Sequence, residues 1–441
     1  MSRVLSPAQE PFLRHRPSNA LILHLMSAFP PLIESFILRE VRQLHDDGWN
    51  VAVAGLRPVD NELRVKGFED LDKYVSPVTW VSADLFIGTT FFVFHRPRQV
   101  WECLKLVFKA ANQPVWFVKM LYTLLSSLRF AYRFRNSSVG MVRAHFLHTE
   151  ALGARFINKV LDIPYSVTVY TVFVHYPRSV IQDIVHHADV LVADTSQTRQ
   201  FLESLGAEPK RICVVHNSVR IEDYPLRIVG SEDQVPLLLA VARLCPKKGF
   251  DVLLHACSIL RGRGVAFRCA IVGDGGEMDR LLEIRRCLGL ETQVEMVGKL
   301  AFPEIKHWYY KADVFAMPSI VTPDGDSDGL PTVVVEAMAS GLPVVGTTTG
   351  GIPDAVSDGL NGFLVPPSDP NSLADRIQLL IENRELRHRF GREGRHLAES
   401  AFNLKLKGEA LSRVILEHLD SRIWPPSNPA EFKELNQNAY Q

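Results

Sequence analysis

Two carboxylates, Asp328 and Glu336, stand eight positions apart in the stretch whose residue types could do the most chemistry. Asp328 ends an acidic, glycine-rich turn, and Glu336 lies within the helix that Pro331 is suited to begin. Free N–H groups at a helix N-terminus attract anions. Carboxylates beside such a site would repel phosphate, so we expect Asp328 and Glu336 to accept hydrogen bonds from sugar hydroxyls.

This block resembles the E-x7-E element of the retaining nucleotide-sugar glycosyltransferases of family four, and the chain resembles their exopolysaccharide and colanic-acid-type members. Glu336 matches the second acid of the element, whereas Asp328 is shorter than the family's usual first glutamate. The resemblance implies that Asp328 and the following Gly329, Leu330 and Pro331 hold the donor sugar. It also implies that Glu336 holds the donor ribose.

The acidic run D-G-D-S-D-G has two metal-binding interpretations. It looks like the opening of a calcium loop, but position 12 is Val335 where glutamate is needed, which argues against calcium. It also contains a D-x-D, which other glycosyltransferases use to bind a metal on the diphosphate. Because a helix N-terminus and basic residues can take that role, we expect no required metal and keep a divalent metal as an alternative. A helix-capping loop would explain Asp328 alone.

The stretch ARLCPKKGFDVLLHA resembles the family's G-R-L-x-x-x-K-G-x-x-x-L-x-x-A element. Arg243 and Lys248 fall on the two basic positions that clamp the donor diphosphate in relatives. The chemistry needs cations there, since the leaving group is a nucleoside diphosphate whose charge grows as the glycosidic bond breaks.

Three glycine turns complete the predicted donor site. RCAIVGDGG resembles the family's V-G-D-G-P turn, with Gly273 facing the donor, and Met278 in place of a third glycine excludes an NAD fingerprint. VEMVGK, which contains Val297, resembles the strand whose following loop touches the base. Gly350 and Gly351 precede a further helix N-terminus.

The first half of the chain carries the expected acceptor side. FPPLIESF resembles the F-P-x-x-S-E-T-F element of exopolysaccharide-type members, which implies that Glu34 and Ser35 lie at the acceptor end. Alternatively, these two residues only begin a helix. GMVRAHF resembles the H-x-H-F element, with Arg143 in place of the first histidine and His145 matching the second.

The largest departure from the family lies in PYSVTVYTVFVH. Tyr170 takes the place of the histidine at the reacting end of the sugar, and Phe173 takes the place of an aspartate. A tyrosine can hydrogen-bond a sugar hydroxyl, but it does not carry a proton near neutral pH as histidine does. His175 lies close in sequence and is a candidate to compensate.

Apolar runs that alternate with helical patterns predict an α/β protein with parallel sheets. The resemblance implies the GT-B fold, with two Rossmann-like domains facing across a cleft, the acceptor in the first and the donor in the second. The expected boundaries are a disordered tail at 1–18, the first domain at 19–220, the second at 235–403, a helix returning to the first domain at 404–424, and a loose tail at 425–441.

Residues 85–135 depart from the strand–helix alternation, because they are helical in pattern, aromatic and basic. From His95 to Arg135 there are eight lysines or arginines and one acid, Glu102. We expect a helical insertion that could lie on the anionic inner face of a membrane. The alternative is a set of domain helices whose apolar faces are core.

Composition limits the other partners and the compartment. The formal net charge is zero, which gives no general attraction to nucleic acid. The six cysteines show no metal spacing and fit reduced thiols in the cytoplasm. There is no apolar run of about 18 residues, so no transmembrane helix is expected.

The predicted activity is that of a retaining hexosyltransferase with a nucleotide-sugar donor. We expect the acceptor to be a hydroxyl of a lipid-linked or polysaccharide intermediate in cell-surface polysaccharide biosynthesis. Two alternatives remain: a catalytically silent GT-B-like binding or regulatory protein, which Tyr170 and Phe173 favour, and a nucleotide-sugar epimerase.

Overall fold

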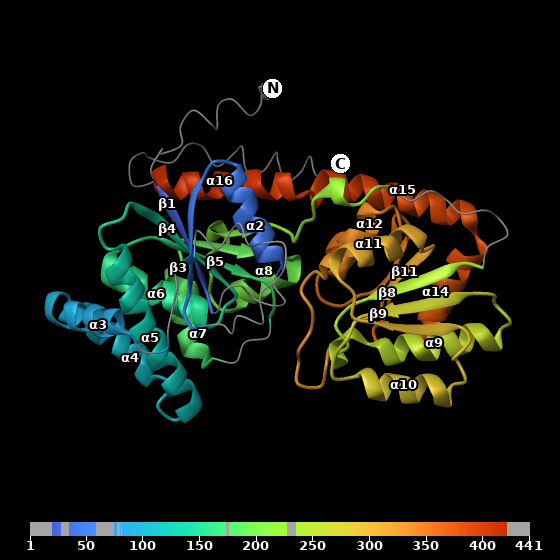
Figure 1. Ribbon diagram of the computed structural model, residues 1–441, viewed down its shortest axis with the longest axis horizontal. Coiled ribbons are helices and arrows are strands. Elements are labelled where there is room, and N and C mark those ends of the chain that lie inside the picture. Colours follow the sequence, from blue (N-terminus) through green and yellow to red (C-terminus); the bar gives the residue numbers. More distant parts are fainter. Residues whose placement is uncertain are drawn as a thin grey trace, which may run out of the picture.

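The computed structural model describes residues 20–27, 35–58, 75–76, 80, 82–172, 176–226 and 235–420. These residues form two parallel sheets, one in each half of the chain (Figure 1). The first sheet has seven strands in the order β3-β2-β1-β4-β5-β6-β7, and the second has six in the order β10-β9-β8-β11-β12-β13. In each sheet the order reverses beside the first strand, which is the Rossmann-like topology expected from the sequence.

The first sheet and the elements around it cover the first half of the chain. Their bounds are β1 Leu21–Met26, α2 Ser35–Asp46, β2 Asn50–Gly55, β3 Val75–Ser76, β4 Val139–His145, α6 Thr149–Leu161, β5 Tyr165–Val169, α7 Arg178–His187, β6 Val190–Ala193, α8 Ser196–Ser204, η3 Pro209–Arg211 and β7 Ile212–Val214.

The second sheet begins after a short linking segment. Its elements are η4 Ile221–Asp223, β8 Leu237–Val241, η5 Pro246–Lys248, α9 Phe250–Gly262, β9 Arg268–Val272, α10 Met278–Cys287, β10 Val294–Gly298, α11 Phe302–Lys311, β11 Val314–Met317, α12 Thr332–Ala339, β12 Val344–Thr347, α13 Ile352–Ala355, β13 Gly362–Val365 and α14 Pro370–Glu382.

Most strands are continuous apolar runs, such as VLVA in β6 and VFAM in β11, and every residue of these two strands is buried. Such runs are typical of parallel sheets that helices cover on both faces. Strands β1 and β4 are exceptions, because they bury His24, Arg143 and His145. Buried polar groups need partners, and those partners help to define the candidate site.

The described part of the chain ends in two helices that together span both halves of the molecule (Figure 1), α15 Arg384–Ala401 and α16 Leu404–Asp420. Helix α16 packs against the first half, where Lys407 Nζ lies 3.0 Å from Glu40 Oε2 and Trp49 Nε1 donates to Ser412 Oγ at 2.8 Å. The expected return of the C-terminal helix to the first domain is therefore confirmed.

Between β3 and β4 the chain forms three helices, α3 Ala83–His95, α4 Pro97–Phe108 and α5 Pro114–Phe134. Helix α5 packs on α6, and α3 packs on α5. In Figure 1 the three helices extend from the first sheet on the side away from the second. They occupy the basic, aromatic segment that the sequence singles out.

The carboxyl ends of the two sheets meet. Tyr170 and Asp194, which follow β5 and β6, contact the loop between β11 and α12 at Gly329 and Leu330. Ligands of open α/β sheets bind at carboxyl edges, so this junction is the natural place to look for a site. The expected tails at 1–18 and 425–441 lie outside the described residues.

Candidate active site

Lysines and carboxylates form a compact cluster at the carboxyl edge of the second sheet. Lys248 Nζ donates to Asp328 Oδ2 at 2.7 Å, and Ser319 Oγ donates to the same oxygen at 3.0 Å. Lys247 Nζ lies 3.0 Å from Asp326 Oδ1 and 3.8 Å from Asp328 Oδ1. The structure therefore brings together two residues predicted from distant segments, Lys248 and Asp328, and adds Lys247.

The backbone beside this cluster requires glycine. Gly249, directly after Lys248, has φ +62°, and a Cβ there would lie 2.0 Å from the Pro318 carbonyl oxygen. No other residue type tolerates both that conformation and that contact. This close approach of the loop after β8 to the end of β11 holds Lys248 next to Asp328 and Ser319.

A cavity of about 420 Å³ lies next to the cluster. Its polar lining includes Arg243, Lys247, Asp324 and Asp326. The volume lies in the range of small-molecule sites, and both cations and carboxylates face it. Arg243, which was predicted to bind the donor diphosphate, is thus at the wall of a cavity beside Lys247.

The predicted glycine turns surround this region. Gly273 has φ +149°, and a Cβ on it would lie 1.8 Å from the Ala242 carbonyl oxygen, so the end of β9 abuts the residue before Arg243. Gly350 has φ +62°, and a Cβ there would lie 2.1 Å from the Asp328 carbonyl oxygen. Gly351 N–H donates to the Gly329 carbonyl at 3.0 Å. The turn at residues 350–351 thus buttresses the loop that carries Asp328.

Glu336 occupies a more enclosed position than Asp328. It is 5% exposed, Tyr309 Oη donates to its Oε2 at 3.0 Å, and Arg39 of α2 lies 3.6 Å from its Oε1. Burial, and then the Glu336 charge, raise the pKa of the Tyr309 phenol, so this hydroxyl stays protonated and can donate. The acid predicted to hold ribose is therefore covered by an arginine from the first half of the chain.

Further groups of the first half cover the neighbouring backbone. Asp194 Oδ2 accepts a hydrogen bond from Leu330 N–H at 3.4 Å, and a Cβ on Gly329 would lie 2.2 Å from the Tyr170 carbonyl oxygen. Asp354 Oδ2 accepts from Ser196 N–H at 2.6 Å. Burial raises the pKa of Asp194 to about 7, despite the hydrogen bonds that its carboxyl accepts from the Thr198 hydroxyl and Leu330 N–H.

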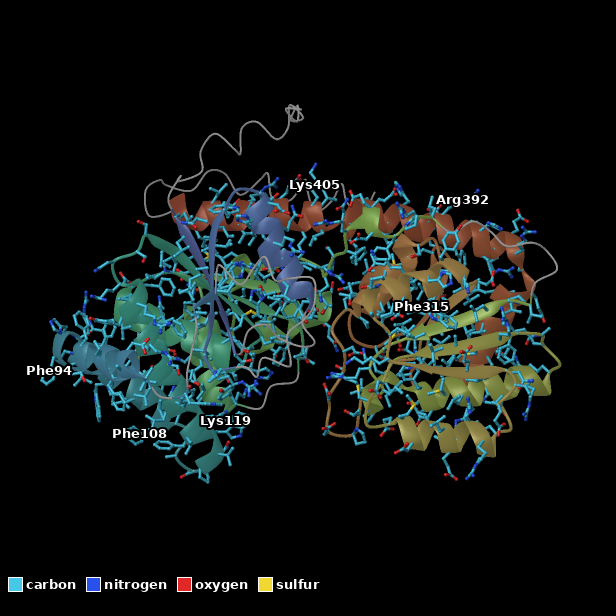
Figure 2. All side chains as sticks on the ribbon, viewed as in Figure 1. Phe94, Phe108, Lys119, Phe315, Arg392 and Lys405 are labelled. Atoms are coloured by element: carbon cyan, nitrogen blue, oxygen red, sulfur yellow. The ribbon has the colours of Figure 1, made fainter. Side chains whose placement is uncertain are left out.

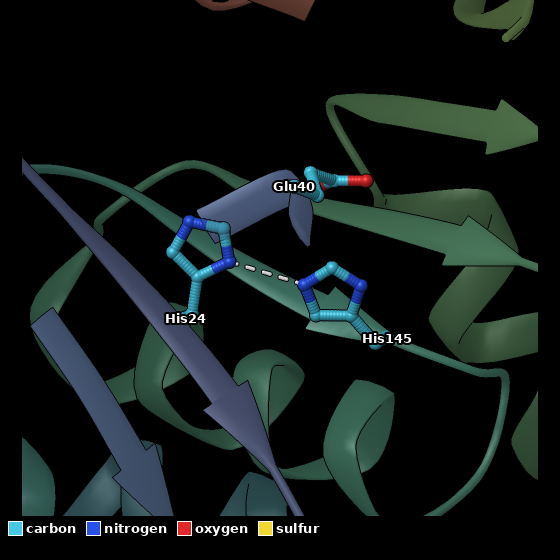
Figure 3. Close-up of side chains that lie close together, drawn as sticks. All are labelled: His24, Glu40 and His145. Atoms are coloured by element: carbon cyan, nitrogen blue, oxygen red, sulfur yellow. Dashed lines mark hydrogen bonds between the residues drawn. The ribbon is translucent and has the colours of Figure 1, made fainter. Parts of the chain in front are cut away.

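Tyr170 belongs to a buried chain of hydrogen bonds. His145 Nδ1 is 3.2 Å from the Tyr170 hydroxyl, and His145 Nε2 is 3.1 Å from His24 Nδ1 (Figure 3). Burial lowers the pKa of His145 to about 3 and that of His24 well below its usual value, so both rings are neutral near pH 7. The Phe36 ring packs on Tyr170 with centroids 4.8 Å apart.

His24, Glu40 and His145 are residue types that bind metals, and their ligand atoms lie within 4.8 Å of one another (Figure 3). Glu40 already pairs with two cations, Arg143 at 2.7 Å and Lys407 at 3.0 Å. A divalent ion would add two positive charges beside two buried ones, which is costly in a low-dielectric interior. The cluster suits hydrogen bonding and ion pairing better than metal binding.

The remaining predicted residues are placed as follows. Val297 is partly buried at the end of β10 and packs against the core of the second half. Pro331 precedes α12, whose first residue is Thr332. Glu34, Phe173, His175 and the side chain of Ser35 lie outside the described residues.

Sequence reasoning missed Arg39, Asp194 and His24, and it assigned the two basic diphosphate positions to Arg243 and Lys248 without Lys247. Two of these left a local signal: His24 interrupts the apolar run of β1, and Asp194 directly follows β6. Polar residues at those positions are unusual unless they serve a site or a buried network. Arg39 gave no such signal, because it is one of several charges on α2.

Residues 226–397 match the family described as glycosyl transferases group 1. The colanic acid biosynthesis glycosyltransferase WcaL of Salmonella typhimurium is 37% identical over 196 residues, covering 44% of this chain and 48% of that protein. WcaL of Escherichia coli is 28% identical over 361 residues, covering 79% of this chain and 87% of that protein. The family match covers the part of the chain that forms the second sheet. The match to WcaL of Salmonella typhimurium spans about half the length of that protein.

The fold of this chain is shared with HepE of Anabaena, solved in complex with UDP. The TM-score is 0.68 at 18% identity, covering 90% of this chain and 99% of HepE. At that identity the likeness establishes the fold alone, and it confirms the expected GT-B arrangement of two Rossmann-like sheets.

Proposed function

We propose that the chain transfers a hexose from a nucleotide-sugar to a hydroxyl of a lipid-linked or glycan acceptor, with retention at the anomeric carbon, during exopolysaccharide biosynthesis. The observation that carries the proposal is the cluster of Lys247, Lys248, Asp326 and Asp328 beside a cavity at the carboxyl edge of the second sheet. The match of residues 226–397 to the group 1 glycosyl transferases and the similarity to WcaL support it.

The cluster has the chemistry that such a donor needs. Lys248 and Lys247 are neutralised by Asp328 and Asp326, and a bound diphosphate would take over these cations together with Arg243. Asp328 would then be free to accept hydrogen bonds from the sugar. Cations fixed next to the leaving group stabilise the charge that develops as the bond breaks, and losing one such contact typically costs about 3 kcal/mol.

The first half contributes little acid–base chemistry in this proposal. His145 is buried and neutral, and Tyr170 is hydrogen-bonded to it rather than to a strong base. In the front-face mechanism proposed for the family, the donor phosphate itself helps to take the acceptor proton. That mechanism accommodates a tyrosine where relatives have histidine, and it asks for no metal.

A UDP-sugar is the first donor to test, because HepE was solved with UDP. The relatives named for colanic acid biosynthesis point to a growing polysaccharide as the acceptor. We place the protein in the cytoplasm, peripheral at the inner face of the membrane. Within the described part of the chain, every helix is too short or too polar to cross a bilayer.

A donor-binding protein without turnover is the second candidate. One observation favours it: groups of the first half cover the residues predicted to hold the donor, with Arg39 on Glu336 and Asp194 on Leu330 N–H. Such a protein would bind a nucleotide-sugar and never transfer it.

The test is donor binding by calorimetry and turnover across UDP-, GDP-, ADP- and dTDP-sugars, with and without lipid-linked acceptors. We expect one donor to bind and turn over, and Lys248→Ala to lower turnover by about a hundredfold or more. Glu336→Ala should weaken donor binding, whereas Lys311→Ala, on the exposed part of α11, should change neither.

Binding of one donor without turnover, even with acceptors present, would favour the silent candidate. Failure to bind any of the four donor classes would contradict both.

A further inference from the structure

Helix α3 is apolar on two opposite faces. Its buried face, formed by Leu85, Gly88 and Phe92, packs into the first half of the molecule. A second face is exposed and carries four large apolar side chains, Phe86 at 61%, Ile87 at 50%, Val93 at 43% and Phe94 at 77% exposure. Phe86 and Val93 lie seven residues apart, and so do Ile87 and Phe94. Because seven residues are close to two helical turns, each pair lies along one line of the helix surface, and the two lines are neighbours. The four side chains therefore form one stripe along the helix. We call them the α3 stripe.

The α3 stripe is held in place by tight packing on the other face of the helix. A Cβ on Gly88 would lie 2.9 Å from the Leu128 carbonyl oxygen of α5, so the two helix backbones approach closely. Asp84 at the start of α3 forms an ion pair with Arg133 of α5. The helix cannot rotate to bury the stripe without breaking these contacts.

The neighbouring helices α4 and α5 also expose large apolar side chains. Trp101 and Phe108 on α4 are both 54% exposed, and Val115 and Val118 at the start of α5 are both 64% exposed. Together with Trp80 and the α3 stripe, they are nine of the sixteen exposed large apolar side chains of the described residues. In Figure 2 Phe94 lies at the outer tip of the molecule and Phe108 near the same end. Apolar patches of this kind mark sites of interaction.

Exposed basic side chains lie on and next to the same three helices. Arg96 and Arg98 follow the α3 stripe in sequence, Lys105 and Lys119 are exposed on α4 and α5, and Lys109 is exposed just after α4. Since the whole chain has a formal net charge of zero, the excess of cations here is local. Apolar and aromatic side chains bordered by lysine and arginine fit the boundary between the headgroups and the acyl chains of an anionic bilayer.

We infer that α3, α4 and α5 form a docking surface for an anionic lipid bilayer, with the α3 stripe entering the interface and the basic residues contacting phosphate headgroups. The inference rests on the proposed function, which places the protein at the inner face of the membrane. It names the surface of the protein that contacts the membrane there. The helices lie in the interface and do not cross it, in keeping with their length and polarity.

A second copy of the chain is a poorer occupant of the same surface. In a symmetric dimer the same patch faces itself, so Arg96 and Arg98 of two copies would be brought together around the paired stripes. Like charges at close range disfavour that contact, whereas anionic headgroups neutralise them.

The test is flotation of the full chain with vesicles of phosphatidylcholine alone or mixed with phosphatidylglycerol. We expect binding to the mixed vesicles, and a loss of at least tenfold in partitioning for Ile87→Ser with Phe94→Ser. Arg96→Glu with Arg98→Glu should cause a similar loss, and raised salt should mimic it. The matched control is Leu360→Ser with Leu379→Ser, two leucines exposed in the second half, which should bind as the parent protein does.

Three results would overturn the inference: no flotation of the parent protein, flotation that the stripe variants leave unchanged, or stripe-dependent self-association in sedimentation instead of vesicle binding. The assay contains no donor or acceptor. Its failure is therefore distinguishable from failure of the proposed transfer activity, which the donor panel tests without vesicles.

Discussion

The carboxyl edges of the two sheets differ in how far their charged and titratable side chains are exposed to solvent. At the second sheet, Lys247, Lys248, Asp326 and Asp328 have side chains that keep 10–32% of their exposure beside a cavity. At the first sheet, His24, His145 and Asp194 are wholly buried. Burial lowers the pKa of His145 to about 3 and raises that of Asp194 to about 7.

This difference assigns different tasks to the two edges. Partly exposed ion pairs can exchange one anion for another at small cost, which suits a site that binds and releases a charged donor. Fully buried polar groups are expensive to rearrange, which suits a wall that positions other groups. The following predictions sharpen or break this contrast.

The largest expected effect concerns the backbone of the second edge. Gly350→Ala would place a Cβ 2.1 Å from the Asp328 carbonyl oxygen at a φ of +62°. We expect a loss of about 4 kcal/mol or more in the free energy of unfolding measured by urea denaturation, together with loss of donor binding.

The matched control is Gly264→Ala. Gly264 has φ +76° with no atom within 4 Å of the added Cβ, so it isolates the conformational cost of about 1 kcal/mol. Equal losses in the two variants would contradict the role given to the close approach of residues 350 and 328.

The next effect concerns the buried edge of the first sheet. Because the pKa of Asp194 is raised to about 7, its carboxyl stays neutral in the folded state while it ionises in the unfolded state above about pH 4. The stability that this gives is fully present at low pH and is lost as the pH rises to about 7.

Asp194→Asn should remove that dependence. Between pH 5 and pH 8 the free energy of unfolding should fall by about 3 kcal/mol less in the variant than in the parent. Asp375→Asn, at a side chain that is 60% exposed, should leave the slope unchanged. The same slope in Asp194→Asn and the parent would mean that Asp194 ionises normally, and the contrast between the edges would weaken.

The smallest effect tests the contact between the two halves. Arg39 and Glu336 have side chains that are 16% and 7% exposed, and their ion pair at 3.6 Å covers the acid assigned to the donor ribose. If the donor must displace Arg39, Arg39→Ala should tighten donor binding by about fivefold, which corresponds to about 1 kcal/mol.

Calorimetry with the donor identified in the panel measures this change, and Arg42→Ala on the same helix serves as the control. Weaker binding in Arg39→Ala would instead make Arg39 part of the donor site. In that case the first half would also help to bind the charged donor, and the contrast between the two carboxyl edges would not hold.

Much of the fold could be read from local pattern. Apolar runs that alternate with helical patterns predicted parallel sheets, and strands such as β6 (VLVA) and β11 (VFAM) are runs of this kind that are fully buried. The spacing of Asp328 and Glu336 and the lysine after β8 led to the candidate site. These signals are local because strand burial, helix ends and glycine turns depend on neighbouring residues.

The partners of those residues could not be read in the same way. Lys248 meets Asp328 from 80 positions away, and Asp194 meets Leu330 from 136 positions away. Tyr170 was assigned from its position in a motif, but its hydroxyl lies against His145, and His145 lies against a histidine of β1. Such pairings depend on how two sheets and their loops come together.

The amino-acid sequence by itself determined that apolar runs would form parallel sheets, where glycine turns would stand beside the donor site, and which residue types could hold a sugar nucleotide. The tertiary structure alone decided that Glu336 faces Arg39, that His145 is neutral, and that α3 presents a second apolar face to solvent. Periodicity and turn chemistry act over a few residues, whereas burial, ionisation and exposure depend on the surroundings that distant segments create.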